Sequence, residues 1–426
     1  MITALIIIFI AGYIAIAFES VIKINKAAIA LITGVLCWMI YLISSGGKSI
    51  VLGQLSGAIS ELSAILFFLM SAMAIVELID AHDGFEIISG RINFANKRQL
   101  LWIISLLTYF ISPVIDNLTT SIVMVALMRK FIQDPGDRFI FSGMIIIAAN
   151  AGGVWSPIGD VTTTMLWIGG QISSFNIVYN LFLPGLVSLL VPLTIISFRV
   201  IDRSGNKVVA EVIEKKATVL SRDQYIVFIS GFLIMILVPV FKIVTGLPPY
   251  MGMLIGLGIL WVITEIIHGK KNEQEKHVLS VAYALQKIDT PSILFFLGIL
   301  LSISSLQASG ILKDLAYLVK SNLANENIII VAIGLLSSII DNVPLVAASQ
   351  GMYSLSQYPV DHHLWIFLAY CTGAGGSLLL IGSAAGVAVM GMEKITFCWY
   401  LKNITMLAFL GFIGGILVYL LQYYIF

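Results

Sequence analysis

Long apolar stretches alternate with short polar ones along nearly the whole chain. Ten of them are long enough to cross a bilayer as a helix, which takes about 20 apolar residues for roughly 30 Å of hydrocarbon. The first of these stretches, at 2–18, has no basic residues at its start and no small-residue cleavage site, so we expect it to be a retained membrane span and not a signal peptide. The ten lie near residues 2–18, 26–44, 61–79, 139–168, 177–198, 225–245, 250–268, 290–308, 363–390 and 403–424.

Two further apolar regions, 100–131 and 327–356, do not fit a single crossing. Each has a polar centre, which reads SPVIDN at 112–117 and SSIIDN at 337–342. The arms on either side of each centre are about 14 residues long, and at about 1.5 Å per residue such a helix is too short to cross. We therefore expect two re-entrant hairpins whose tips stop inside the membrane, where irregular backbone is tolerated only within protein or beside a water-filled cavity.

The composition narrows the class of protein further. Hydrophobic residues make up 59% of the 426 residues and charged residues only 11%. Because soluble domains carry about 25% charged residues, the composition excludes soluble, disordered and nucleic-acid-binding proteins. The three cysteines all lie in apolar runs, so a disulfide framework is not expected.

The positive charges predict an orientation for these spans. If the N-terminus is outside and each hairpin returns to its own side, 20 of the 24 Lys and Arg residues fall in cytoplasmic segments. Such a bias is typical of the cytoplasmic side of membrane proteins. We therefore expect a multi-pass protein of the cell inner membrane with both termini outside. The four exceptions are Lys48, Lys242, Lys313 and Lys320.

Short motifs recur in the same order in the two halves of the chain. ILFFL occurs at 65–69 and 293–297, SxxIDN recurs after 225 positions, and GGxxxxIG at 152–159 recurs at 375–382. The matches indicate two structural repeats, each with five spans, one re-entrant hairpin and one broken helix. Because five is odd, the second repeat must be inverted relative to the first, an arrangement typical of secondary transporters.

The repeats set the domain boundaries that we expect. The first inverted repeat covers 1–200, a cytoplasmic linker covers 201–224, and the second inverted repeat covers 225–426.

An aspartate lies at each predicted hairpin tip. A charge at bilayer depth costs at least about 2.5–3.5 kcal/mol, unless it binds a cation or takes up a proton. Asn117 and Asn342 follow Asp116 and Asp341 and add a carbonyl oxygen to each tip, and a proline near each turn should break the helix there. Carboxylate and carbonyl oxygens suit hard cations, so the tips suit a cation–proton exchanger. The alternative is that each aspartate only caps the second arm of its hairpin.

A second polar group interrupts the apolar run at 150–164, which reads NAGGVWSPIGDVTTT. Its glycines and proline should unwind a helix in mid-membrane and expose carbonyls beside Asn150, Asp160 and Thr162. The counterpart in the second half places Ser383 where the first half has Asp160. The alternative is that the glycines only allow close helix packing, which does not account for a buried aspartate.

A third cluster ends the third span on the predicted cytoplasmic side. It consists of Glu77, Asp80, His82 and Asp83. Because histidine titrates near neutral pH, the cluster is a candidate proton path or pH sensor. An ordinary solvated helix end explains it equally well.

The motifs together resemble the NhaD-type bacterial sodium/proton antiporters of the ion transporter superfamily. The resemblance rests on SPVIDNLTT at 112–120, NAGGVWSPIGDVTT at 150–163, the second hairpin tip, the second glycine break, and ELIDAH at 77–82. It implies export of Na⁺ or Li⁺ in exchange for H⁺, no cofactor, and a homodimer with scaffold and transport domains. The related dicarboxylate carriers have Ser-Asn-Thr at their tips, where this chain has Asp-Asn, as expected for a cation site.

We therefore predict a secondary antiporter and not an enzyme, with its main Na⁺ site at Asp116, Asn117, Asn150 and Asp160. Na⁺ and protons would compete for the same carboxylates. The residues predicted to take part in transport or cation binding are Asp116, Asn117, Thr119, Asn150, Ser156, Asp160, Thr162, Thr163, Ser337, Asp341, Asn342, Ser377 and Ser383.

Other functions remain open at this point. The nearest is another carrier of the superfamily, either an arsenite exporter or a Na⁺-coupled carboxylate transporter, although no Lys or Arg occurs at either tip or break. An intramembrane aspartyl protease would also use two aspartates, but the repeat has no role in that chemistry. A passive channel would differ from an exchanger in having a Na⁺ flux independent of the proton gradient.

Overall fold

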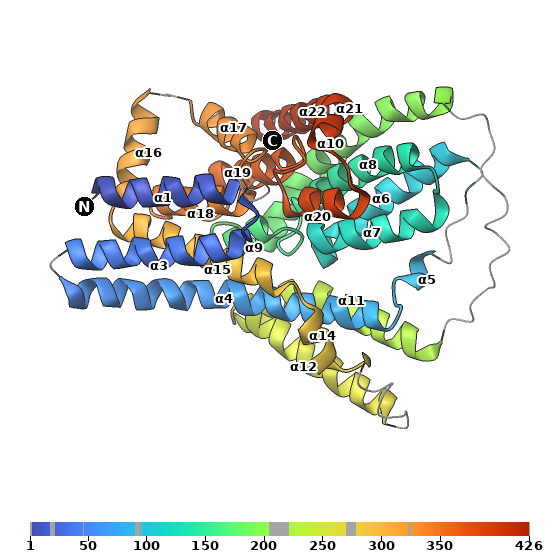
Figure 1. Cartoon of the computed structure of the whole chain (residues 1–426), viewed down its shortest axis with the longest axis horizontal. Coiled ribbons are helices and arrows are strands. Elements are labelled where there is room, and N and C mark those ends of the chain that lie inside the picture. The colour runs from blue at the N-terminus through green and yellow to red at the C-terminus, as the bar shows by residue number, and fades with distance from the viewer. Residues whose placement is uncertain are drawn as a thin grey trace.

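The computed structural model of the chain is built from helices. It describes residues 2–17, 22–45, 47–89, 94, 96–203, 221–269, 278–322 and 325–425, and all regular secondary structure in these segments is helical (Figure 1). Eight helices within them are long and apolar enough to cross a membrane. The protein is therefore a polytopic all-α membrane protein, as the hydrophobic pattern predicts. Three shorter apolar helices are Ile2–Ile16, Glu326–Leu336 and Ala384–Glu393.

The two halves of the chain contain helices in the same order. In each half three helices precede two helices that meet at a tip, and a helix broken in the middle and one long helix follow. The first half contains α1 (Ile2–Ala17), α3 (Lys26–Ser44), α4 (Lys48–Ala81), α6 (Lys97–Ile115), α7 (Asn117–Phe131), α8 (Pro135–Gly153), α9 (Val161–Ile168) and α10 (Ser174–Arg203). The second half contains α11 (Arg222–Thr245), α12 (Pro249–His268), α15 (Thr290–Ala308), α17 (Glu326–Leu336), α18 (Asn342–Met352), α19 (His363–Gly375), α20 (Ala384–Glu393) and α22 (Thr405–Ile425).

Four short helices connect these elements. They are α5 (Glu86–Ser89), α14 (Val281–Lys287), α16 (Ile311–Asn322) and α21 (Phe397–Asn403). The predicted linker at 201–224 lies mostly outside the described residues, because α10 ends at Arg203 and α11 begins at Arg222.

Helix packing divides the molecule into two groups. In one group α3 packs along α15, with α1 and α4 beside this pair (Figure 1). The α3 and α15 backbones touch, since a Cβ at Gly34 would lie 2.6 Å from the carbonyl oxygen of Gly298. In the other group α6 packs on α8, α17 on α19, and α10 along α22. We call the first group, with α11 and α12, the scaffold, and the hairpins with the broken helices the transport group.

Equivalent contacts recur in the two halves of the transport group. The Ser112 hydroxyl donates to the Ala149 carbonyl at 2.6 Å, and the Ser337 hydroxyl donates to the Thr372 carbonyl at 2.7 Å. Each bond joins the first arm of a hairpin to the first part of a broken helix. A Cβ at Gly159 would lie 2.8 Å from the Cα of Pro113. Gly159 is therefore needed for direct backbone contact between the first broken helix and the first hairpin.

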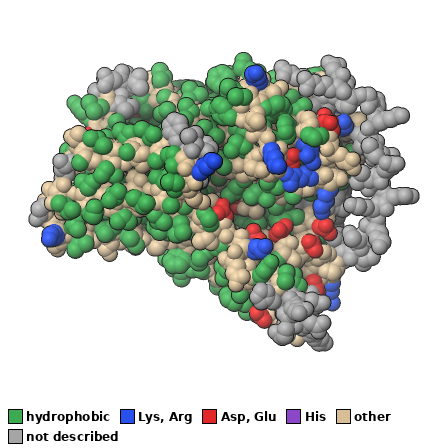
Figure 2. Space-filling view, viewed as in Figure 1, with side chains coloured by type: hydrophobic (Ala, Val, Ile, Leu, Met, Phe, Trp, Pro, Cys, Tyr) green, Lys and Arg blue, Asp and Glu red, His purple; other side chains and the backbone are tan. Residues whose placement is uncertain are grey.

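Charged and apolar side chains separate on the molecular surface. On the face in Figure 2, charged side chains gather toward the end where α5, α7 and α20 lie, and hydrophobic side chains cover most of the opposite end. An apolar surface of this extent is expected where helices face lipid. The concentration of charge at one end agrees with the uneven distribution of Lys and Arg in the sequence.

The structure corrects three details of the predicted elements. α4 begins at Lys48 and not near residue 61, because its first 13 residues contain no proline and expose most of their polar side chains. α6 has 19 residues, so this arm is longer than the predicted 14 and qualifies by length as a spanning helix. Pro113 and Pro344 both lie inside helices; the first hairpin breaks at Asp116, and the second breaks over residues 337–341.

Candidate functional site

The first hairpin turns at Asp116. This residue has a φ of 95°, a left-handed backbone conformation that is strained for a residue other than glycine, between the end of α6 and the start of α7. Its carboxylate accepts bonds from both the backbone nitrogen and the hydroxyl of Thr119, each at 2.8 Å. Asp116 therefore caps α7 and in addition presents a partly buried carboxylate at the tip.

Asp160 lies in the break between α8 and α9 and is only 1% exposed. One carboxylate oxygen, Oδ1, accepts from the Thr162 backbone nitrogen at 2.8 Å and from the Thr162 hydroxyl at 2.7 Å. The break is tight, because a Cβ at Gly153 would lie 2.5 Å from the carbonyl oxygen of Gly159. The two glycines thus allow the chain to fold back and bring Asp160 to the start of α9.

Asparagines from both hairpins converge on Asp160. The Asn117 amide donates to Asp160 Oδ2 at 2.5 Å, and the Asn342 amide lies 3.4 Å from each carboxylate oxygen. All three side chains are buried. An aspartate of the first broken helix therefore joins the tips of the two hairpins, which lie far apart in the sequence.

Asn150 connects the two halves in the same place. Its carbonyl oxygen accepts from the Asn117 amide at 3.0 Å, and its own amide donates to the hydroxyls of Ser377 at 2.9 Å and Ser383 at 3.0 Å. Asn150 is fully buried, so these bonds are made away from solvent. Each is worth about 0.5–1.5 kcal/mol net, and together they hold the two broken helices in register.

A cavity of about 50 Å³ lies between these residues and the scaffold. The carboxylates of Asp116, Asp160 and Asp341 all line it, and no Lys or Arg is among its lining residues. Carboxylate and amide oxygens in a small enclosed space are the ligands that hard cations prefer. Since about 10–15 Å³ of such volume holds one water, the cavity has room for a small ion with a few waters.

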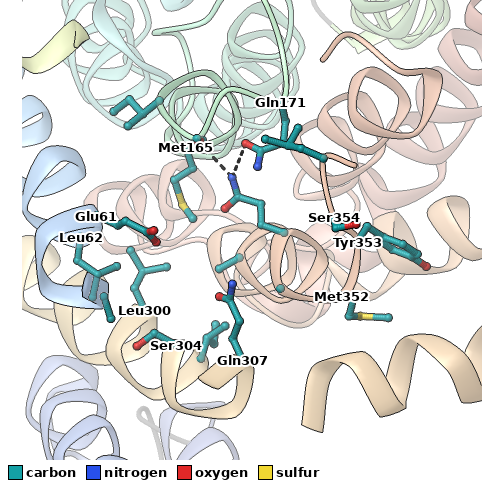
Figure 3. A pocket seen from close by; sticks show the side chains of 18 of the residues that line it. Glu61, Leu62, Met165, Gln171, Leu300, Ser304, Gln307, Met352, Tyr353 and Ser354 are labelled. Atoms are coloured by element: carbon teal, nitrogen blue, oxygen red, sulfur yellow. Dashed lines mark hydrogen bonds between the residues drawn. The ribbon is translucent and has the colours of Figure 1, made fainter. Parts of the chain in front are cut away.

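A larger cavity of about 1240 Å³ is lined in part by the same helices as the small one (residues that line the larger cavity are drawn in Figure 3). Leu62 on α4 and Leu300 on α15 line it from the scaffold, and Met165 on α9 lines it from the transport group. Residues about one turn further along these helices line the small cavity, among them Phe296 on α15. The barrier between the two cavities is therefore about one helical turn thick.

Polar side chains surround the mouth of the larger cavity. Glu61, Ser304 and Gln307 project into it from α4 and α15 (Figure 3). On the opposite side the side-chain amides of Gln350 and Gln171 lie 2.9 Å apart, a contact that links α18 to the segment after α9. The sequence analysis did not single out these glutamines, because they lie 179 positions apart.

Three predicted site residues contact backbone oxygens. The Ser156 hydroxyl donates to the Pro113 carbonyl at 2.6 Å, Thr163 donates to the Asp160 carbonyl at 2.9 Å, and Ser337 donates to Thr372 as described above. The Ser156 and Ser337 hydroxyls thus hold the hairpins against the broken helices, the Thr163 hydroxyl stabilises the first turn of α9, and none of the three lines the small cavity.

The predicted cluster at the end of α4 lies apart from the small cavity. His82 is buried and contacts His268 of α12, with 2.7 Å between the two Nε2 atoms, and its Nδ1 lies 2.6 Å from the Leu78 carbonyl oxygen. Glu77 and Asp80 do not line the cavity. The structure thus brings together a histidine pair that no sequence motif indicates, because its members are 186 positions apart.

Comparison with known proteins identifies the family. A family model described as a citrate transporter matches residues 13–367. The chain is 47% identical to "Sodium/proton antiporter 1" of Arabidopsis thaliana over 96% of this chain and 70% of that protein. It is 32% identical to "Na(+)/H(+) antiporter NhaD" of Vibrio cholerae over 98% of this chain and 91% of that protein. The chain belongs to the NhaD-type sodium/proton antiporter family.

Membership of the NhaD-type family confirms the resemblance of the hairpin and glycine-break motifs. A relative named "Na(+)/H(+) antiporter NhaD" from Alkalimonas amylolytica matches 97% of the chain at 30% identity. The match therefore covers the scaffold as well as the site, and the chain is a membrane transporter and not an enzyme.

Proposed function

We propose that this protein exports Na⁺ in exchange for H⁺ across the cell membrane. The observation that carries the proposal is the convergence of Asn117 and Asn342 on Asp160, within a cavity that three aspartates line. The printed names of the relatives support the same exchange.

In this proposal Na⁺ and protons occupy the same carboxylates in turn. Na⁺ binds between Asp116 and Asp160 while both are ionised, and the Asn150 and Asn117 amides hold the surrounding oxygens in place. When protons bind the carboxylates, their charge no longer attracts the ion and Na⁺ leaves. Because the carboxylates lie close together, they titrate as a coupled set.

Alternating access would move the transport group as one body against the scaffold. Bonds between the halves support this motion, since Asn150 joins the two broken helices and Glu393 of α20 pairs with Arg129 at 2.5 Å and Arg138 at 3.2 Å. The Glu393 side chain is 1% exposed, whereas those of Arg129 and Arg138 are 39% and 29% exposed, so only the carboxylate side of the pairs is buried. The repeated hairpin contacts support the two predicted repeats, and the inversion of the second repeat and the re-entry of the hairpins belong to the same proposal.

We further propose that the larger cavity is the outward vestibule. Its lining comes from segments that the charge distribution assigns to the outer side, including the start of α4, the end of α9 and the segment around Tyr353. In this state the ion leaves to the outside once the one-turn barrier opens. Residence in the inner membrane, homodimer formation and transport of Li⁺ follow from the resemblance and belong to the same proposal.

The description of the family model raises carboxylate transport as a second function. The cavity argues against it, because about 50 Å³ is too small for a tricarboxylate and three aspartates would repel an anion. We therefore expect no citrate uptake with or without Na⁺.

The test is cation-induced proton movement in proteoliposomes that contain a pH-sensitive dye. Addition of Na⁺ should release protons from an acidified lumen, K⁺ should do so poorly, and Li⁺ should act like Na⁺. Na⁺ flux that does not depend on a proton gradient would indicate a channel and would refute the proposed exchange.

A further inference from the structure

A lysine lies at the boundary between the scaffold and the transport group. Lys242 is in the last turn of α11, and it is one of the four basic residues that the charge distribution leaves on the outer side. Its Nζ donates to the Trp167 carbonyl at 2.9 Å and lies 4.5 Å from the centroid of the Trp167 ring. An ionised side chain in a spanning helix is costly unless it has a partner, and Trp167 supplies one through both its backbone and its ring.

Trp167 offers a favourable place for an ammonium group. It lies in the last turn of α9, where the carbonyls lack partners within the helix and the helix dipole is negative. The Gly170 nitrogen also donates to the Trp167 carbonyl, but at 3.3 Å this bond is longer than the one from Lys242. The Trp167 side chain is buried, so the aromatic face beneath the ammonium is fixed in the core. The bond from Lys242 is charge-assisted and therefore stronger than a neutral one.

The contact between Lys242 and Trp167 crosses the boundary that moves during transport. α11 packs on α12 and α4 of the scaffold, and α9 packs on α18 and α19 of the transport group. Both helices reach the small cavity, which Met235 of α11 and Thr164 of α9 line. Met165, two positions before Trp167, lines the larger cavity. Lys242 therefore joins the two groups on the vestibule side of the cation site.

An ion pair crosses the same boundary at the charged end of the molecule. Lys130 of α7 pairs with Glu86 of α5 at 3.0 Å, and the two side chains are 54% and 38% exposed. α5 lies on the scaffold side, because Phe85 directly before it packs on Phe228 of α11 with 6.3 Å between the ring centroids. Exposed ion pairs are screened by water and stabilise little. The half-buried Lys242 therefore makes the stronger of these two contacts.

We propose that the contact between Lys242 and Trp167 is a latch that holds the outward-facing state. While the latch is closed, α9 is fixed against α11 and the cation site faces the vestibule. The movement that turns the site toward the cytoplasm separates these two helices and breaks the latch. Lys242 is a positioning residue, because it acts on the cation site through α9 and does not contact the ion. The inference rests on the proposed exchange by alternating access.

The first test measures the balance between the two states. Lys242→Met removes the ammonium, and loss of a charge-assisted hydrogen bond should lower the ratio of outward-facing to inward-facing protein about tenfold. Ser304→Cys reports this ratio, because Ser304 projects into the vestibule and a cysteine there can react with an impermeant thiol reagent from outside (Figure 3). We expect slower reaction in Lys242→Met and an unchanged rate in Lys242→Arg, which keeps the charge. The exposed Cys398 is replaced by serine in every variant.

The second test separates a latch from a contact that only stabilises the fold. A shift toward the inward-facing state should raise the apparent Km for Na⁺ added outside and lower it for Na⁺ added on the cytoplasmic side. Right-side-out and everted vesicles give the two values. A loss of stability alone would lower the maximal rate in both without opposite shifts in Km. Lys48→Met is the matched control, since Lys48 is also half-buried, begins the scaffold helix α4 and should leave all three measurements unchanged.

Two results would overturn the latch. Labelling rates and Km values in Lys242→Met equal to those of the wild type would show that the contact does not bias the two states. Km values that shift in the same direction on both sides would also contradict it. If Lys242→Met does not accumulate, Lys242→Gln, which also lacks the charge, replaces it with the same outcomes. Failure of the proposed function is distinct, because the wild type itself would then show no Na⁺-driven proton movement, whereas the labelling rates could still be compared.

Discussion

Replacement of Asp160 by asparagine changes the charge at the centre of the site with almost no change in size. In the wild type Asp160 Oδ1 accepts both bonds from Thr162, and Oδ2 accepts the Asn117 amide at 2.5 Å. An asparagine keeps the Thr162 bonds through its single carbonyl oxygen. Its own amide nitrogen then faces the Asn117 nitrogen, and because both groups are donors this bond is lost.

The size of the effect follows from these contacts. A hydrogen bond to a charged group is worth about 1.5–3 kcal/mol, so the variant should unfold more easily by roughly that amount. A carboxylate about 4 Å from a monovalent cation attracts it by about 4 kcal/mol at an effective dielectric of about 20. At about 1.4 kcal/mol for each tenfold change, loss of this attraction corresponds to about a thousandfold weaker Na⁺ binding.

The assay is the apparent Km for Na⁺ in proteoliposomes across the alkaline range. In the wild type Na⁺ competes with protons for the carboxylates, so Km should fall as pH rises, by up to about tenfold per pH unit for each competing proton. Asp160→Asn should raise Km and flatten this dependence. Asp160→Glu keeps the charge but lengthens the side chain by about one methylene, so it should raise Km more than it lowers the maximal rate.

Ser383→Ala is the matched control for Asp160. Ser383 occupies the equivalent position in the second half, accepts the Asn150 amide at 3.0 Å and caps α20 through the Gly386 nitrogen at 3.2 Å. Its loss removes two hydrogen bonds but no charge, so Km should change far less than in Asp160→Ala. If Asp160→Asn had an unchanged Km and an unchanged pH profile, Asp160 would be structural and the cation would bind elsewhere.

Three further outcomes are expected. Asp116→Asn should abolish Na⁺-driven proton movement while the protein still reaches the membrane, and near-normal exchange would refute the proposed site. A cysteine placed within 204–216 should react with an impermeant reagent only from the cytoplasm, and one within 357–361 only from outside; the reverse pattern would contradict the inverted repeats. Glu393→Gln breaks two ion pairs whose arginines are partly solvated and should lower stability by about 1–3 kcal/mol, seen as a lower thermal midpoint; an unchanged midpoint would show that the pairs contribute nothing.

Local sequence signals predicted the helices and the two tips. The apolar periodicity and the lengths of the stretches follow from the thickness of the bilayer, which acts on each segment separately. The motif at Asp116 recurs at Asp341, and the two glycine breaks recur in the same order, so the paired hairpins and broken helices could be expected without tertiary information.

Details that depend on neighbouring helices could not be predicted. α4 begins 13 residues before the apolar stretch that was predicted to span the membrane. This N-terminal extension contains no proline, and most of its polar side chains are exposed, so the helical conformation can continue through it. Pro113 was expected to break its helix, but it is accommodated inside α6, and the turn falls at the aspartate that caps the next helix.

The sequence by itself determined which charged and polar side chains lie within the membrane-spanning segments, since a charge in a long apolar run is costly unless it has a function. Only the tertiary structure decided which of them meet. Asn342 and Asp160 are 182 positions apart, and the sequence spacing of His82 and His268 contains no signal of their contact. Their proximity results from packing between whole helices, which depends on shapes and glycine contacts distributed over the chain and not on any local motif.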